Sequence, residues 1–161
     1  MDDIFYMEKA LELAKQAAQA GEVPVGCVIV RNDQIVAQGR NCRETEKSAL
    51  GHAEIQAIDA ACKALGGWRL WDCTLYVTLE PCSMCAGAII NARIPRVVFG
   101  ARDEKYGACG SVCDLFSMNF NHKPQVTAGV LEEESKALME EFFRQLRITL
   151  RDHPKWRKPT P

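Results

Sequence analysis

Two short motifs combine the residue types that bind metals with one acidic residue. His52-Ala53-Glu54 opens one predicted helix, and Pro81-Cys82-Ser83-Met84-Cys85 opens another. Cys82 and Cys85 are three residues apart, so a helix start places both sulfur atoms on one side. The free N–H groups and the positive pole at this end of a helix stabilise thiolates, the form that binds metal. One imidazole and two thiolates make a donor set that suits zinc.

The number of ligands separates two kinds of zinc site. A structural site uses four protein ligands, whereas a catalytic site uses three and leaves a position for water. Zinc lowers the pKa of such a water to about 7 and so supplies hydroxide at neutral pH. We therefore predict a catalytic site with one Zn²⁺ per subunit, held by His52, Cys82 and Cys85. The alternatives are a pair of buried or redox thiols and a structural module with Cys42 or Cys73 as a fourth ligand.

Glu54 follows the histidine by two residues. Residues two apart on a helix do not face the same way, so Glu54 is not expected to share the metal with His52. It can instead reach water and substrate and move protons as general acid and base. The alternative is an exposed first-turn glutamate, which the helix dipole stabilises by about 0.3–1 kcal/mol.

The motifs need elements that bring both helix starts to one edge of a sheet. Apolar periodicity, caps and turn residues predict a single α/β domain with a mixed sheet of five strands and helices on both faces. Residues 31–33 join two strands into a hairpin, and 101–124 form a long polar loop with one helical turn near 113–116. The predicted helices are 3–20, 53–65, 83–92 and 131–150, and the predicted strands are 25–30, 34–38, 74–79, 96–100 and 125–129.

Composition limits the class of protein. A chain of 161 residues with 47% hydrophobic and 25% charged residues fits one soluble globular domain. It has no apolar run of about 18 residues, which a membrane span requires, and its acidic start lacks the basic region of a secretory signal. A cytoplasmic protein is therefore expected. Eight cysteines would suggest a disulfide framework in a secreted chain, but here buried free thiols are the favoured interpretation.

Charge is distributed unevenly although the net charge is only −1. From residue 142 onward the chain has six basic residues and one acidic residue, which gives this end a net charge of +5. A basic edge of this kind is typical of nucleic-acid binding, and a solvated helix end is the alternative. The basic residues are Arg144, Arg147, Arg151, Lys155, Arg157 and Lys158.

Longer runs around the motifs carry a resemblance to a known family. The pattern H-x-E … P-C-x-x-C is the signature of zinc nucleobase deaminases. Over about residues 5–147 the chain resembles the bacterial tRNA-specific adenosine deaminases, beyond the metal signature that cytidine and guanine deaminases share. The runs that carry the resemblance are Glu22–Gly26, His52–Ile55, Leu75–Cys82, Met84–Ala88 and Arg96–Asp103.

The resemblance implies a fold, a reaction and partners. It implies a homodimer with a three-layer α/β/α, cytidine deaminase-like fold, in which a deaminase domain spans 1–151 and a basic tail spans 152–161. The implied reaction is hydrolytic deamination of adenosine to inosine at wobble position 34 of an arginine tRNA anticodon. Hydroxide activated by zinc would attack adenine C6 while Glu54 moves protons and ammonia leaves. The partner would be the tRNA anticodon arm, and no membrane is implied.

The resemblance also assigns substrate-binding residues. Asn41 would hold the target nucleoside, although a loop Asn can equally satisfy a turn. Asp103 would contact the nucleotide backbone beside the target, with a helix cap as the alternative. Tyr106 departs from the family pattern and could stack on a base, a contact worth about 1–3 kcal/mol. The remaining assignments are Ala53 and Pro81 inside the motifs, Lys105, Asn121 and His122 as weaker RNA contacts, and Arg144, Arg147 and Arg151 as contacts to the tRNA.

Some positions leave the substrate less defined. Cys42 stands where the family pattern has Arg or another polar residue, and Cys109 and Cys113 are softer than expected in the long loop. A guanine or cytosine deaminase would explain the zinc motif equally well, but not the Arg102-Asp103 region or the basic end. RNA is favoured because a single-stranded loop can turn a base into a pocket with little loss of stacking.

Overall fold

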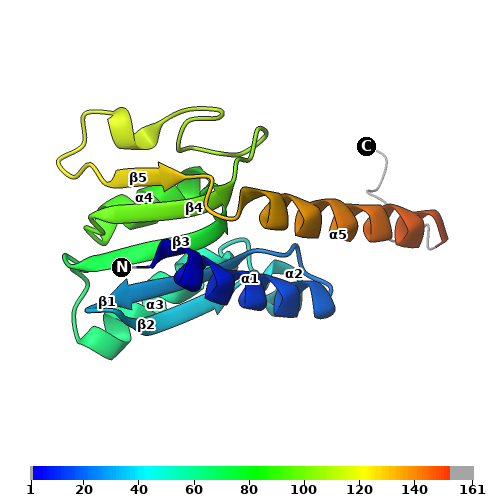
Figure 1. Cartoon of the computed structure of the whole chain (residues 1–161), viewed down its shortest axis with the longest axis horizontal. Coiled ribbons are helices and arrows are strands. Elements are labelled where there is room, and N and C mark those ends of the chain that lie inside the picture. Colours follow the sequence, from blue (N-terminus) through cyan, green and yellow to red (C-terminus); the bar gives the residue numbers. More distant parts are fainter. Residues whose placement is uncertain (1, 153–161) are drawn as a thin grey trace.

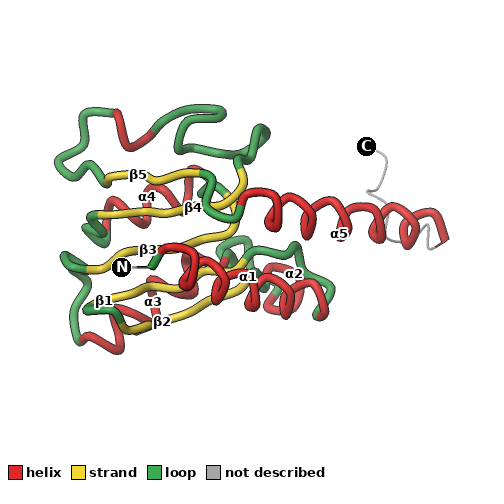
Figure 2. Tube along the Cα trace, viewed as in Figure 1, coloured by secondary structure: helices red, strands yellow, loops and turns green. Residues whose placement is uncertain are grey.

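The chain folds into one mixed sheet between two layers of helices in the computed structural model, which describes residues 2–152 (Figures 1 and 2). This architecture and the order of its elements confirm the predicted fold class. The helices are α1 (Asp3–Gln19), α2 (Arg43–Glu46), α3 (Ala53–Leu65), α4 (Ser83–Asn91) and α5 (Glu132–Asp152), with a 3₁₀ turn at Leu115–Ser117; the strands are β1 (Gly26–Arg31), β2 (Gln34–Arg40), β3 (Cys73–Leu79), β4 (Arg96–Ala101) and β5 (Gln125–Ala128).

The strands lie in the order β2-β1-β3-β4-β5. β1 pairs antiparallel with both β2 and β3, whereas β3–β4 and β4–β5 are parallel. The carboxyl ends of β2, β3 and β4 therefore meet the start of β1 at one edge of the sheet. The segments after these three strands carry Asn41, the Pro81–Cys85 motif and the Arg102-Asp103 region. This edge is where the sheet topology gathers the candidate site.

Local signals explain where the elements begin and turn. The Asp2 carboxylate accepts a hydrogen bond from the Phe5 N–H at 3.2 Å and caps α1. Asn32 and Asp33 both have positive φ, 51° and 58°, which is the conformation of the two-residue turn that matches strand twist. The predicted β-hairpin is confirmed.

The two faces of the sheet form separate apolar layers. One layer packs α3 and α4 against the side chains of Ile29, Leu75 and Val97, and the other packs α1 against those of Val28 and Tyr76. Figure 1 shows α1 and α5 on the near face of the sheet and α3 and α4 behind it.

A glycine lets α3 approach the sheet closely. A Cβ atom at Gly39 in β2 would overlap the carbonyl oxygen of Ala53 in the first turn of α3. The absence of a side chain at Gly39 therefore brings the start of α3, and with it the His52 motif, directly onto the sheet.

Several expectations receive a structural answer here. All eight cysteines are free thiols, so the disulfide framework is absent. Ile89 and Ile90 of α4 are buried in the core. The segment 39–51, expected as a loop, contains the one-turn helix α2. None of the helices within residues 2–152 has the length and apolar character that a membrane crossing needs. The predicted tail, 152–161, lies outside the described residues apart from Asp152.

Candidate metal centre and substrate cleft

A cleft of about 1160 Å³ opens at the sheet edge where the two motif-bearing helices begin. Its floor is formed by His52, Ala53 and Glu54 at the start of α3 and by Cys82 at the start of α4. Three further walls surround this floor: the segment 41–49, the segment 101–106, and one side of α5. The predicted convergence of both motifs above one sheet edge is therefore found in the structure.

The three predicted ligands form one compact donor set. The Nδ1 atom of His52 lies 3.5 Å from Cys82 Sγ and 3.4 Å from Cys85 Sγ, and all three donor atoms lie within 4.8 Å of one another. A tetrahedral zinc ion with ordinary Zn–N and Zn–S bond lengths would separate nitrogen from sulfur by about 3.6 Å. The residues present therefore fit a zinc ion. Neither Cys42 nor Cys73 joins the cluster, so residues 2–152 supply three ligands and no fourth cysteine.

The pKa values of the two thiols move in opposite directions. A hydrogen bond from Cys85 and a second one with His52 lower the pKa of Cys82 to about 4, despite partial burial. The same bond with Cys82, followed by burial, raises the pKa of Cys85. The hydrogen bond with Cys82 also raises the pKa of His52. Such a pair carries one thiolate and one thiol, so binding of a metal to both sulfurs releases the remaining proton.

Glu54 is buried at the base of the cleft and stands outside the donor set. Only 4% of the residue is exposed, although it lines the cleft. Burial raises the pKa of its carboxyl group to about 7, and hydrogen bonding lowers it only in part. The alternative of an exposed first-turn glutamate is wrong. A carboxyl group in this position can accept and return a proton near neutral pH.

A second buried carboxylate organises the wall that carries Asn41. Glu22 is 2% exposed and accepts hydrogen bonds from the N–H groups of Glu44 and Thr45 and from the Thr45 hydroxyl. These contacts fix α2 beside the cleft. Asn41 lines the cleft, while its amide donates to the Val23 carbonyl at 3.3 Å and its oxygen accepts the Arg43 N–H at 3.4 Å.

The segment after β4 forms the opposite wall. Asp103, Lys105 and Tyr106 all line the cleft. The Asp103 carboxylate accepts the N–H groups of Lys105 and Tyr106 at 3.1 and 3.2 Å, which closes a tight turn. Tyr106 is 72% exposed, so most of its ring surface is available to a ligand. Pro81 does not line the cleft; its carbonyl oxygen accepts the Ala108 N–H at 2.8 Å and ties this wall to the cysteine motif.

The helix α5 contributes one basic residue of the predicted set to the cleft. Arg147 lines it, together with Lys136 from an earlier turn. Arg144 instead forms an ion pair with Glu141, with a closest N–O distance of 2.8 Å. Arg151 lies in the last described turn and is exposed, but it does not line the cleft.

Two predicted RNA contacts lie elsewhere in this chain. His122 precedes β5, and its Nε2 atom lies 2.6 Å from the carbonyl oxygen of Ile94, just before β4. Because β3, β4 and β5 are parallel, the starts of these strands are at the sheet edge opposite the metal cluster. Asn121 is exposed next to His122. The structure does not bring these two residues together with the site.

Other cleft residues carry no sequence signal that singled them out. Arg43 and Lys136 add basic side chains to the lining. Arg43 belongs to the short helix that was expected as a loop, and Lys136 is one of several charged residues on α5. Only the contact between distant segments identifies them.

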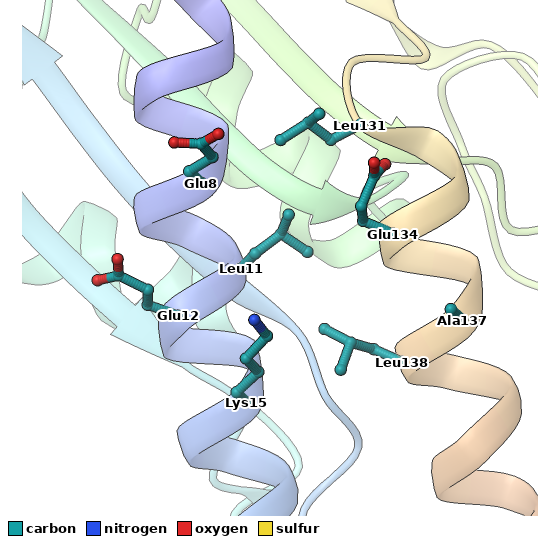
Figure 3. A pocket seen from close by; sticks show the side chains of 8 residues that line it. All are labelled: Glu8, Leu11, Glu12, Lys15, Leu131, Glu134, Ala137 and Leu138. Carbon is teal, nitrogen blue, oxygen red and sulfur yellow. The ribbon is translucent and has the colours of Figure 1, made fainter.

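A second cavity, of about 550 Å³, lies between α1 and α5 (Figure 3). Leucines 11, 131 and 138 line it together with glutamates 8, 12 and 134. None of its lining residues is a histidine or cysteine. It is a groove between packed helices, and it lacks the donor types that make the cleft a candidate site.

Comparisons with known proteins agree with this geometry. Residues 1–147 match the family of MafB19-like deaminases. The tRNA-specific adenosine deaminase of Bacillus subtilis (strain 168) is 52% identical over 146 residues, which cover 90% of this chain and 91% of that protein.

Solved structures share the fold. One from biochemical and structural studies of A-to-I editing by tRNA:A34 deaminases at the wobble position of transfer RNA is 44% identical, with a TM-score of 0.81, and the match covers 83% of this chain and 98% of that one. Guanine deaminase from Bacillus subtilis is 30% identical, with a TM-score of 0.63, over 100% and 99% of the two chains.

The fold and the His-Cys-Cys site thus define a deaminase of the cytidine deaminase-like class. Within this class, the chain belongs to the family of tRNA-specific adenosine deaminases.

Proposed function

We propose that this protein is the hydrolytic deaminase that converts adenosine to inosine at wobble position 34 of tRNA. The observation that carries the proposal is the buried Glu54 carboxyl group beside the compact cluster of His52, Cys82 and Cys85, at the base of an open cleft. The same geometry in a member of this family supports adenosine as the target.

The chain's own residues provide binding and proton transfer. His52, Cys82 and Cys85 would hold a zinc ion, which would supply the Lewis acid that activates water. The Glu54 carboxylate accepts a proton from this water and delivers it to adenine N1. After water adds at C6, Glu54 takes the proton of the new C6 hydroxyl group and passes it to the exocyclic amine, which leaves as ammonia. A group that exchanges two protons works best with a pKa near the operating pH, and burial gives Glu54 this property.

The walls of the cleft suit a nucleotide within RNA better than a free base. At about 1160 Å³ the cleft exceeds the range of about 300–1,000 Å³ that is usual for small ligands. Asn41 can release its 3.4 Å contact with the Arg43 N–H and bond the nucleoside, and the exposed ring of Tyr106 can stack on a flanking base. The basic residues of the lining are placed for phosphates: Arg43, Arg102, Lys105, Lys136 and Arg147.

The finer points of the proposal rest on the resemblance to the family and on the sequence rather than on the cleft. One zinc ion binds per subunit, the active form is a homodimer in the cytoplasm, and the substrate is the anticodon arm of an arginine tRNA. The deaminase domain spans 1–151, with 152–161 as a basic tail. Asp103 contacts the backbone next to the target base, Ala53 forms part of the floor, and Pro81 acts only through its carbonyl oxygen, which fixes the wall at Ala108. Asn121 and His122 take no part in the cleft of their own chain.

The test compares four substrates for the purified, zinc-loaded protein: an arginine tRNA with A34, free adenosine, guanine and cytidine. Inosine confined to position 34 is expected, with the metal content measured in parallel. Removal of zinc by a chelator abolishes the activity, and added zinc restores it. The matched variant Glu54→Ala retains zinc and loses turnover. Product from guanine or cytidine alone would overturn the choice of substrate, and full activity of Glu54→Ala would overturn the mechanism.

A further inference from the structure

A single buried carboxylate accepts four hydrogen bonds from the wall after β4. Glu80 immediately precedes the Pro81–Cys85 motif, and its side chain is 0% exposed. Its Oε1 atom accepts the Asp103 N–H at 3.1 Å and the Ser111 hydroxyl. Its Oε2 atom accepts the N–H groups of Cys109 and Ser111 at 3.0 and 3.1 Å. Four donors from nine residues of chain thus converge on one side chain.

The wall is also fastened to the metal-binding segment itself. Gly107 forms an isolated antiparallel bridge with Cys82. A Cβ atom at Gly107 would overlap the Glu80 carboxylate, so only glycine allows the chain to pass this close. Through these contacts Glu80 lies between the metal motif and the residues that face a substrate.

The nearest basic side chain does not account for this burial. Arg102 Nη1 lies 4.0 Å from Glu80 Oε1, and the arginine side chain is 51% exposed. A separation of this length at the surface contributes little to stability. The hydrogen bonds from the loop are therefore the main partners of the carboxylate, and a buried anion needs such donors.

We propose that Glu80 is a positioning residue that holds residues 103–111 as the outer wall of the adenosine pocket and so determines how tightly the tRNA binds. The inference rests on the proposed function, because it assigns this wall to that substrate. Glu80 is among the residues along the cleft, but its side chain is 0% exposed and hydrogen-bonded to the loop. It acts through Asp103, Lys105 and Tyr106, which the loop carries into the cleft.

The geometry predicts that an amide cannot replace the carboxylate. In Glu80→Gln one oxygen becomes an NH₂ group, which has no lone pair to accept a backbone N–H. With the NH₂ at the Oε1 position, the Asp103 N–H loses its acceptor; at the Oε2 position, the N–H groups of Cys109 and Ser111 lose theirs. Buried donors without acceptors destabilise the loop conformation.

The first experiment measures amide hydrogen exchange in the zinc-loaded protein, wild type against Glu80→Gln. Protection of the amides of Asp103, Cys109 and Ser111 is expected to fall by about 10- to 100-fold, the range for a lost charge-assisted hydrogen bond. The amides of α3 and α4 keep their protection. Unchanged protection at all three loop amides would overturn the proposal. This readout is independent of the substrate, so it separates a failure here from a failure of the proposed function.

The second experiment measures kcat and KM on tRNA for the same variant. KM is expected to rise about tenfold or more, with kcat within about threefold and zinc content unchanged, because misplaced binding residues weaken the complex. Ser111→Ala removes one of the four donors and gives a smaller rise. Asp3→Asn, on the far face of the sheet, is the control for a general loss of stability and leaves KM unchanged. An unchanged KM, or a loss of kcat together with zinc, would overturn the proposal.

Discussion

The two faces of the sheet each hold a carboxylate, and their surroundings differ. On the α1 face, Asp3 accepts two N–H groups of Arg96 at 2.9 and 2.7 Å and the Tyr76 hydroxyl at 2.7 Å. These contacts, led by the bond from Arg96, lower its pKa. On the α3 face, burial raises the pKa of Glu54 to about 7. Asp3, with its matched cation, stabilises the fold, whereas Glu54, whose burial raises its pKa toward neutrality, is available for chemistry.

The largest effect expected from this contrast is the loss of activity in Glu54→Gln. The amide cannot carry a proton from water to adenine, so turnover falls by about 10²–10⁴-fold. The free energy of unfolding does not fall, because burial disfavours the charged carboxylate and a neutral amide of the same size avoids that cost. Steady-state kinetics and urea unfolding of the zinc-loaded protein measure the two quantities. A variant that is both active and destabilised would reverse the roles assigned to the two faces.

A smaller effect of the opposite kind is expected for Arg96→Met. The substitution removes both N–H donors to Asp3 and leaves its carboxylate without a cation. Charge-assisted hydrogen bonds in a partly exposed pair imply a loss of about 1–3 kcal/mol of unfolding free energy. The kcat per folded molecule stays within about twofold, since Arg96 begins β4, at the sheet edge opposite the metal cluster. The midpoint and slope of urea unfolding test this, and an unchanged midpoint would contradict it.

The smallest effect is the pH dependence that Asp3 gives to stability. The folded-state pKa of Asp3 lies below its ordinary value of 3.8, so its contribution is complete above that pH. It disappears as the pH falls through the lowered folded-state pKa. The difference in unfolding free energy between wild type and Asp3→Asn is therefore about 1 kcal/mol at pH 7 and shrinks below pH 4. A difference that stays constant down to pH 3 would argue against the ion pair.

The sequence predicted those parts of the site that depend on local spacing. Cys82 and Cys85 are three residues apart at a helix start, and the structure brings their sulfur atoms within the same donor set as His52. The hairpin was predicted from the short polar connection 31–33. Its turn is a local feature, formed by the positive φ angles of Asn32 and Asp33.

What the sequence could not predict depends on contacts between distant segments. Glu22 binds the backbone of Thr45, 23 residues away, and Glu80 binds Ser111, 31 residues away. Neither glutamate differs locally from a surface residue at the end of an element. The one-turn helix α2 is too short to show periodicity. The family resemblance assigns His122 to RNA contact, but the residue lies before β5, at the sheet edge opposite the metal cluster.

Gly39 lies outside the reactive chemistry, yet it constrains how the protein can change. Any other residue there would press a side chain against the backbone of Ala53, next to His52 of the candidate metal cluster. In a genetic screen, substitutions at this position would abolish function as often as substitutions at the candidate metal ligands, although glycine has no functional group. Alanine, the smallest replacement, is expected to give temperature-sensitive alleles. Its methyl group would displace the start of α3 and weaken the packing of this helix on the sheet, which heat would then disrupt.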